Sequence, residues 1–587
     1  MSSFSKKWHL KSQSCEGLIV ITLFIITALL YYHDTFNYWF IIDDAAAILR
    51  SADPLKEILF ANIYSYAFYT PLVALSFKPD VSFFGLNPVP YHVHNTLTLV
   101  FIAFMIYQIL RLYTDRISSS VAAVVVLFST PSLVCLLWIV LRQYLCAMLF
   151  SLISIYLFLK YKPDLKNNKF IVMIILILSE LSFMGKEQYM TLPLVLFILS
   201  DGGLKDRIYK TYPYFILLTG HFLLRMYVLG GLGGYLGGNY LNYSPVVYIK
   251  TVFESIFAES KVLFGYEWFV ILIVLPFLLR PQKIVLSALL WTASLLISFF
   301  AMSAYPYADT YRYWFISTVM ISVMTGFAVN AVKRKIIKTI FFSAILLAFF
   351  VNTLNINKDV KIIFHEKSTV AKSVSKALVD SKYLNAVIIF PDDIFLVASQ
   401  YIEYMVAIYH SLYKIKSHTT FLPFEFIVFY PEIIEDYERV YEIKSNSIID
   451  ITDSIDAKIK VFKDILLDER PAVGLIKSKN KAELVLKCES GKAIIAYSIS
   501  WKYGRLFYGE TIGPYLEKID LVPFFRTKDI DIIPVENIKY HDKTWHIDKR
   551  SLQDGETLVT ISCFTQENKV TTLSDMIYIR KQKDNQR

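Results

Sequence analysis

The sequence predicts a polytopic α-helical membrane protein with a C-terminal extracytoplasmic domain that combines an α/β part with a β-sandwich-like part. Of the 587 residues, 55% are hydrophobic, and the mean hydropathy of +0.45 is well above that of an ordinary soluble domain. Long apolar segments recur as far as residue 354. Charged residues return after it, and the apolar runs shorten to strand length.

The membrane part, residues 1–354, contains about eleven apolar segments, several of them near the roughly 20 residues that a spanning helix needs. The first could pass for a secretory signal, but no small-residue cleavage pattern follows it, so we interpret it as a retained span. The approximate bounds of the segments are 17–32, 91–112, 117–138, 143–161, 169–184, 189–200, 211–229, 267–280, 284–303, 313–332 and 338–354.

Lys and Arg residues cluster in alternate loops. If the N-terminus is cytoplasmic, most of them fall on the cytoplasmic side, as the positive-inside rule requires of a protein in the inner or plasma membrane. This distribution explains the net charge of +10 without a nucleic-acid partner, because no basic stripe with interleaved aromatic residues stands apart from the apolar segments. An odd number of spans then places the first outer loop, 33–90, and residues 355–587 in one extracytoplasmic compartment.

The C-terminal domain divides at about residue 437. In 355–437 the pattern predicts helices over 368–382 and 398–413 and a buried strand over 386–390, which indicates an α/β part. In 438–587 it predicts a β-rich part with strands over 458–462, 482–488, 492–497, 557–563 and 576–579. Cys488 and Cys563 lie on two of these strands; a disulfide between them and two buried thiols are both compatible with the sequence.

Two adjacent carboxylates, Asp43 and Asp44, stand just after the first span. Placing two carboxylates beside apolar residues at a membrane surface costs free energy, so we expect them to have a structural or functional role. One interpretation is that one of them is an active-site carboxylate. The alternative is that Asp43 caps a short helix over 44–50. The stretch alone leaves both open.

Further polar residues fall on the same predicted face of the membrane. An anionic lipid headgroup at this depth needs cations, and Arg and Lys donors bind phosphate through charge-assisted hydrogen bonds. Each residue alone also fits an ordinary interface position. They are Tyr69, His92, Asn95, Arg142, Lys186, Glu187 and Arg312.

In order and spacing, these residues and their neighbours resemble the GT-C superfamily of membrane glycosyltransferases that use polyprenyl-phosphate sugars, which includes protein O-mannosyltransferases and lipid A aminoarabinose transferases. The resembling elements are the acidic outer loop, Tyr69-Thr-Pro-Leu72, Gly-Leu-Asn-Pro88 with Tyr91-His92-x-x-Asn95, Trp138-x-x-x-Arg142, Lys186-Glu187 and Arg312-Tyr-Trp-Phe315. Many relatives carry Arg where Thr70 stands, so one cation of the pattern is missing here.

The resemblance implies transfer of a sugar from a polyprenyl-phosphate donor to a glycan, lipid or protein acceptor on the extracytoplasmic face. Asp43 or Asp44 would act as general base on the acceptor hydroxyl. Lys186, Arg312 and Arg142 would neutralise the donor phosphate. Glu187 would fix Lys186 or help to bind a metal or the sugar.

His92 and Asn95 match polar positions of the family, and Tyr69 belongs to its Tyr-x-Pro-Leu element. The motifs imply no definite cofactor; a divalent metal is possible but not favoured, because no pair of His residues has a spacing that marks a metal site.

Two other functions are compatible with a polytopic chain. A transporter or flippase of lipid-linked saccharides would place charges at mid-membrane on broken helices and show repeat symmetry, whereas here the charges cluster at one face and no repeat is evident. A non-enzymatic envelope protein would bind a partner through residues 355–587, and the polar residues of the membrane part would then have no catalytic role.

Overall fold

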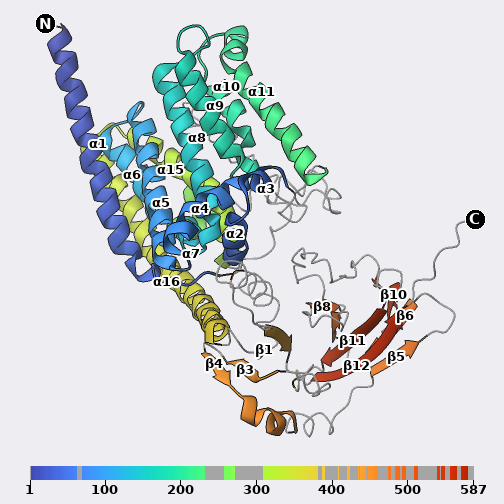
Figure 1. Cartoon of the computed structure of the whole chain (residues 1–587). Coiled ribbons are helices and arrows are strands. Elements are labelled where there is room, and N and C mark those ends of the chain that lie inside the picture. The colour runs from blue at the N-terminus through green and yellow to red at the C-terminus, as the bar shows by residue number, and fades with distance from the viewer. Residues whose placement is uncertain are drawn as a thin grey trace, which may run out of the picture. The chain divides into compact units, whose positions relative to one another are not determined.

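The computed structural model of the chain describes residues 2–41, 43–61, 69–231, 257–271 and 308–380, together with short stretches between residues 386 and 579. The chain divides into two compact units, Met1–Ser368 and Thr369–Arg587 (Figure 1). The first unit is helical among its described residues, and strands occur only in the described part of the second. The boundary predicted after residue 354 lies inside one continuous helix, Lys335–Asp380.

The described helices of the first unit range from single turns to membrane-spanning lengths. In chain order they are α1 (Ser2–Tyr32), η1 (His33–Thr35), α2 (Asp44–Ser51), α3 (Leu55–Phe60), α4 (Pro71–Phe84), α5 (Pro88–Arg111), α6 (Arg116–Phe128), α7 (Thr130–Leu137), η2 (Ile139–Leu141), α8 (Arg142–Tyr161), α9 (Lys169–Phe183), η3 (Glu187–Thr191), α10 (Leu192–Leu199), α11 (Leu204–Leu229), η6 (Ala308–Trp314), α15 (Phe315–Ala331) and α16 (Lys335–Asp380).

Five stretches of helix within the described residues are long and apolar enough to cross a membrane, and a bent pair makes a sixth. They coincide with the predicted segments 17–32, 91–112, 117–138, 143–161, 313–332 and 338–354. Segments 169–184 and 211–229 are helical as α9 and α11, and 189–200 forms part of a shorter apolar helix. Segment 267–280 lies mostly outside the described residues, and segment 284–303 lies wholly outside them. The helical membrane character is therefore confirmed, whereas the count of eleven spans stays a prediction.

The bent span joins α6 and α7 at an angle of 45°. Ser129 breaks the helix with extended backbone angles, and its side chain caps the next helix by accepting a hydrogen bond from the Ser132 backbone N–H. Pro131 stands in the first turn of α7, where its missing N–H costs nothing. A cap residue followed by proline thus turns one predicted span into two helices.

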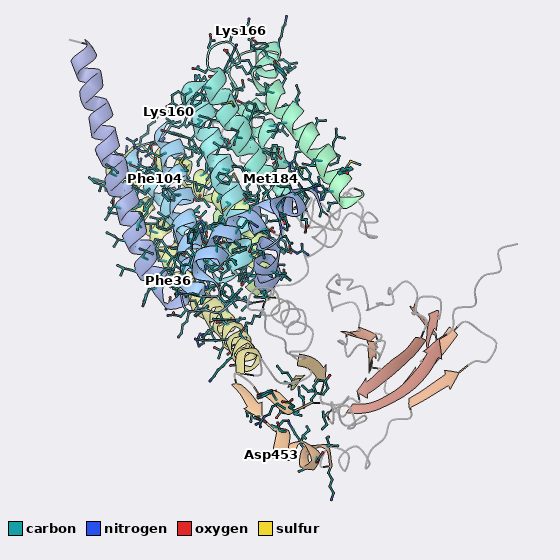
Figure 2. The ribbon with its side chains drawn as sticks, in the orientation of Figure 1. Phe36, Phe104, Lys160, Lys166, Met184 and Asp453 are labelled. Carbon is teal, nitrogen blue, oxygen red and sulfur yellow. The ribbon has the colours of Figure 1, made fainter. Side chains whose placement is uncertain are left out.

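The short helices gather where the long ones end. Helix α2 packs on α4 and meets η2, while η6 packs against α7; Figure 1 shows α2 beside α4 in the helical unit. Phe36, on the stretch that leads to α2, and Lys166, in the α8–α9 loop, lie toward opposite ends of this unit (Figure 2). Most of the predicted site residues fall on these short elements or at the adjoining helix ends.

Within its described residues, the second unit contains three four-stranded sheets, whose strand orders are β2-β1-β3-β4, β5-β6-β10-β9 and β12-β11-β7-β8. In the first, β1 is parallel to both β2 and β3, and the other two sheets are antiparallel. The strands are β1 (Ala386–Phe390), β2 (Thr419–Pro423), β3 (Arg439–Lys444), β4 (Ser447–Asp450), β5 (Val473–Lys477), β6 (Glu483–Cys488), β7 (Lys492–Tyr497), β8 (Tyr508–Ile512), β9 (Ile538–His541), β10 (Thr544–Asp548), β11 (Gly555–Phe564) and β12 (Val570–Ile579).

Five of the six predicted strands match described strands, namely β1, β6, β7, β11 and β12. The strand predicted over 458–462 is wrong for its described part, because the backbone through Lys460 is helical. The predicted strand, Lys458-Ile-Lys-Val-Phe462, is too short for periodicity alone to distinguish a strand from a helix. The helix predicted over 398–413 lies almost wholly outside the described residues. Packing of the two antiparallel sheets as a sandwich and a Cys488–Cys563 disulfide stay predictions.

Candidate functional site

The two adjacent carboxylates have different surroundings. Asp44 is fully buried, and its two oxygens accept hydrogen bonds from the backbone N–H groups of Ile41 (2.9 Å) and Val140 (2.6 Å). It therefore ties the loop before α2 to η2. Asp43 is half-buried at the N-cap position of α2, yet its side chain makes no capping hydrogen bond. The capping alternative is thus not supported for Asp43, and Asp44 has the structural role.

Burial raises the pKa of Asp44 from 3.8 to about 8, against the opposing effect of its backbone donors. The folded protein then keeps a proton that the unfolded chain releases, so the stability that Asp44 contributes is present at low pH and is lost as the pH rises from about 4 to about 8. We expect Asp44→Asn to flatten this dependence. Unfolding temperatures of both proteins in detergent at pH 5 and 8.5 test this, and equal pH slopes would contradict it.

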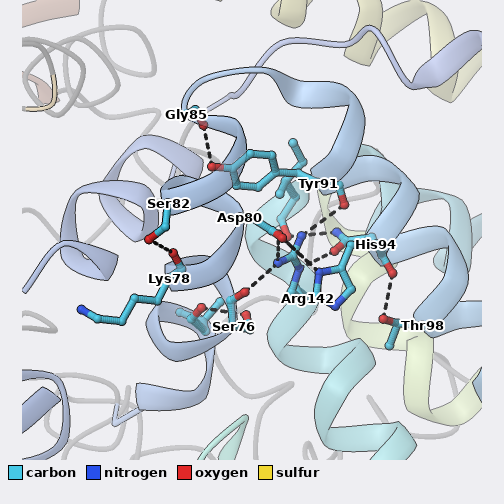
Figure 3. A network of polar contacts seen from close by, with 12 residues as sticks. Ser76, Lys78, Asp80, Ser82, Gly85, Tyr91, His94, Thr98 and Arg142 are labelled. Atoms are coloured by element: carbon cyan, nitrogen blue, oxygen red, sulfur yellow. Dashed lines mark hydrogen bonds and ion pairs between the residues drawn. The ribbon is translucent and has the colours of Figure 1, made fainter. Parts of the chain in front are cut away.

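Arg142 forms the centre of a buried polar network between α4, α5 and α8 (Figure 3). Its guanidinium pairs with Asp80, and it donates from Nε to Asn95 Oδ1 (2.6 Å) and from Nη2 to the Tyr91 carbonyl (3.2 Å). The Phe77 ring lies 4.5 Å from the guanidinium. With no exposed surface and most donors bonded inside the protein, Arg142 does not fit the predicted role of binding the donor phosphate. It holds three helices together instead.

Asp80 is a member of this network that the sequence prediction missed. Burial would raise its pKa, but the hydrogen bonds and charges of His94 and Arg142 outweigh that effect and hold the pKa below 3.8. The His94 ring nitrogen Nδ1 lies 3.3 Å from the Asp80 carboxylate. A single acidic residue within the apolar run of α4 was the available signal, since such a residue usually has a charged partner.

His92 and Asn95 are both buried, on α5. The two ring nitrogens of His92 lie 3.0 Å from the Leu136 carbonyl and 2.9 Å from the Tyr38 carbonyl. Asn95 donates to the Ile139 carbonyl (3.1 Å) in addition to accepting from Arg142. Their polar atoms are therefore engaged with the protein, and both side chains support the helix ends around η2.

Lys186 ends the turn after α9 and Glu187 begins η3, and a second charged cluster forms there. The Lys186 Nζ is 3.6 Å from Glu187, and Arg225 on α11 reaches the other oxygen of Glu187 at 3.4 Å. Lys186 also lies over the Tyr144 ring at 5.7 Å. Glu187 thus joins two cations, as the interpretation that it fixes Lys186 requires. Arg225 was missed by the sequence prediction, although it is a charged residue in an apolar segment.

Tight packing positions this turn. The Leu72 N–H donates to the Met184 carbonyl (3.2 Å), which attaches the turn to α4. Gly185 faces α8 so closely that an added Cβ would lie 2.6 Å from the Ala147 Cβ and 2.9 Å from the Gln143 carbonyl oxygen. Only glycine fits there without a backbone shift.

We expect Gly185→Ala to lower the free energy of unfolding by about 1–3 kcal/mol, the usual cost of overpacking. Because the shift would displace Lys186, it should also weaken binding of any anion held there. Gly220→Ala on α11 is the matched control, since no atom lies within 4 Å of an added Cβ. Thermal unfolding in detergent measures both variants. Equal stability of the two would contradict the packing argument.

Arg312, on η6, lies against aromatic rings. Its guanidinium is 4.3 Å from the Trp138 ring and 4.7 Å from the Tyr313 ring, and it donates to the Tyr313 hydroxyl (2.9 Å). It is half-buried. Of the predicted cations, Arg312 and Lys186 are only partly buried, so their geometry is compatible with contact to a bound anion.

Tyr69 is buried. Its hydroxyl donates a hydrogen bond to the Leu59 carbonyl, and its ring packs beside His221 of α11.

The described residues contain no group of three or more His, Cys, Asp and Glu side chains placed to hold a metal ion. Three of the predicted charged residues in the first unit are half-buried: the carboxylate Asp43 and the cations Lys186 and Arg312, all near helix ends. Such groups can accept a proton and stabilise negative charge on a phosphate.

The fold and these charged groups define a helical integral membrane protein with polar clusters at its helix ends. No protein-family model matches the chain. A segment of 117 residues is 30% identical to the mouse protein O-mannosyl-transferase TMTC3; it covers 18% of this chain and 13% of the mouse protein. The chain is thus similar to a glycosyltransferase over this segment, which supports the resemblance to the GT-C superfamily that its motifs indicated.

Two solved structures also match along most of the chain. Both are of the oligosaccharyltransferase of Archaeoglobus fulgidus, one in complex with zinc and sulfate and the other tethered to an acceptor peptide. Their TM-scores are 0.41 and 0.39, and each is 9% identical in sequence. The matches cover 96% and 99% of this chain and 98% of each archaeal chain. At these scores no function is inferred from them.

Proposed function

We propose that the chain is a membrane glycosyltransferase that transfers a sugar from a polyprenyl-phosphate donor to a glycan, lipid or protein acceptor on the extracytoplasmic face. The observation that carries the proposal is the turn that presents Lys186, braced by Glu187 and tightly packed through Gly185, at the ends of apolar helices. A lipid-linked phosphate is complementary to this arrangement, because its apolar tail can lie along the apolar helices while its charged head contacts Lys186. The similarity to a protein O-mannosyl-transferase supports the proposed reaction.

In the proposed reaction, Asp43 takes the proton of the acceptor hydroxyl, and the resulting oxygen attacks the anomeric carbon of the donor sugar. The bond between that carbon and the phosphate oxygen breaks, and polyprenyl phosphate leaves with the electron pair. Lys186 and Arg312 stabilise the charge that develops on the leaving phosphate. Attack opposite the leaving group inverts the configuration at the anomeric carbon.

The test is a transfer assay with the full chain in liposomes. Polyprenyl phosphates carrying different radiolabelled hexoses are supplied together with envelope glycans, lipids and proteins from cells that lack the chain. Transfer of label to one acceptor class, lost in Lys186→Ala, is the expected result. Movement of labelled donor across the bilayer without any transfer would contradict the proposal and favour a flippase.

A further inference from the structure

A carboxylate–imidazole pair lies between α9 and α11 and has no role in the network around Arg142. Glu180 Oε1 is 2.8 Å from His221 Nδ1, and the His221 side chain is fully buried. The second nitrogen, Nε2, and the second carboxylate oxygen, Glu180 Oε2, are buried without a hydrogen-bond partner among the described residues. An unsatisfied buried polar atom costs about 1–3 kcal/mol. A bound group that forms hydrogen bonds with both atoms would remove this cost.

The pair is held in a fixed orientation. The Glu180 carboxylate accepts a hydrogen bond from the Nδ1 N–H, which leaves Nε2, on the far side of the ring, to bond a further group. The His221 ring packs against the rings of Tyr69 (5.6 Å) and Phe183 (5.5 Å), which restrict its rotation. A hydroxyl group suits both open atoms, because it can donate to Nε2 or to the carboxylate.

The charged cluster lies one helical turn along α11. His221 and Arg225 are four residues apart and so share one face of the helix, and Arg225 contacts Glu187 beside Lys186. Gln188, next to Glu187, is buried with both polar atoms of its amide lacking a described partner. The Glu180–His221 pair therefore lies one helical turn from the cluster of Arg225, Glu187 and Lys186. A ligand with a phosphate at one end and hydroxyls beside it matches this order.

We propose that Glu180, His221 and Gln188 form a subsite for the hydroxyl groups of the donor sugar, next to the phosphate position at Lys186. This inference rests on the proposed function and assigns recognition of the sugar to residues on α9, η3 and α11. A site built to hydrogen-bond hydroxyls discriminates strongly against ligands that lack them, because its buried polar groups are then left unpaired.

The experiment compares two kinds of ligand on the full-length protein in detergent. One is bare polyprenyl phosphate, and the other is the same lipid carrying mannose, glucose or galactose. We expect the wild type to bind one of the sugar-bearing lipids more tightly than the bare lipid. His221→Ala should weaken that binding at least tenfold and leave binding of the bare lipid within twofold. Lys186→Ala should weaken binding of both.

Glu180→Gln provides a second variant, and His33→Ala, at an exposed histidine, is the matched control. The ratio of the two affinities on one variant does not depend on the fraction of folded protein. An unchanged ratio in both His221→Ala and Glu180→Gln would overturn the subsite. Wild-type binding of the bare lipid without a preference for any sugar would also overturn it and leave the proposed function standing. No binding of any lipid would overturn both.

Discussion

Replacing Asp43 by asparagine is expected to lower the rate of sugar transfer by about 100- to 10,000-fold, the contribution that a general base usually makes. Asparagine has nearly the same shape but cannot take the proton of an acceptor hydroxyl. Because the two side chains have nearly the same size, folding should be retained. Initial rates of transfer in liposomes measure the first effect, and the unfolding temperature in detergent measures the second.

Two variants make this result interpretable. Asp34→Asn removes another carboxylate of the segment between α1 and α2, one that is partly exposed and paired with Lys361, and should leave transfer unchanged. Asp44→Asn should reduce transfer much less than Asp43→Asn, because both Asp44 oxygens bond to the backbone and cannot reach an acceptor. Loss of transfer in Asp44→Asn with full activity in Asp43→Asn would reverse the assignment of the base.

Replacing Arg142 by leucine is expected to lower the free energy of unfolding by about 3–5 kcal/mol, since it leaves the buried Asp80 carboxylate without its cation. Arg142→Lys should restore only part of this loss. A lysine ammonium cannot reproduce the fork that bonds Asp80, Asn95 and the Tyr91 carbonyl together. Unfolding of the detergent-solubilised protein gives the measurement.

Arg116→Leu is the matched control for this prediction. Arg116 pairs with Glu16 at 2.7 Å, but its side chain is 64% exposed, and exposed pairs contribute about 0–1 kcal/mol. Adding Asp80→Asn to the Arg142→Leu variant should recover part of the lost stability, because it removes the uncompensated charge. An Arg142→Leu variant as stable as Arg116→Leu would show that the network is not a structural support.

The sequence elements that resemble a glycosyltransferase contain two kinds of residue. In the structure, some hold helices together and others remain able to contact a ligand. Tyr69, His92, Asn95 and Arg142 were predicted as site residues because they are polar and belong to sequence elements that resemble the GT-C superfamily. All four are buried and bonded inside the protein. A polar residue at a helix end is needed both for holding helices together and for binding a ligand, so residue type alone does not distinguish the two roles.

The residues that prediction missed share one sequence feature. Asp80, Glu180, His221 and Arg225 are polar residues within apolar helices, where such groups are costly without a partner. Each does have a described partner, on another helix or on η3. Their pairing depends on how α4, α8, α9, η3 and α11 pack, and one sequence carries no direct record of those contacts.

The sequence was sufficient to predict a helical membrane protein, most of the long helices that the structure describes and five strands of the second unit. Hydropathy and side-chain periodicity are properties of neighbouring residues, and neighbours in sequence stay neighbours in the fold. The difference between Asp43 and Asp44 required the tertiary structure. It arises because Val140, 96 residues further along the chain, brings its N–H to Asp44 and buries that carboxylate, while Asp43 remains half-buried at the start of α2.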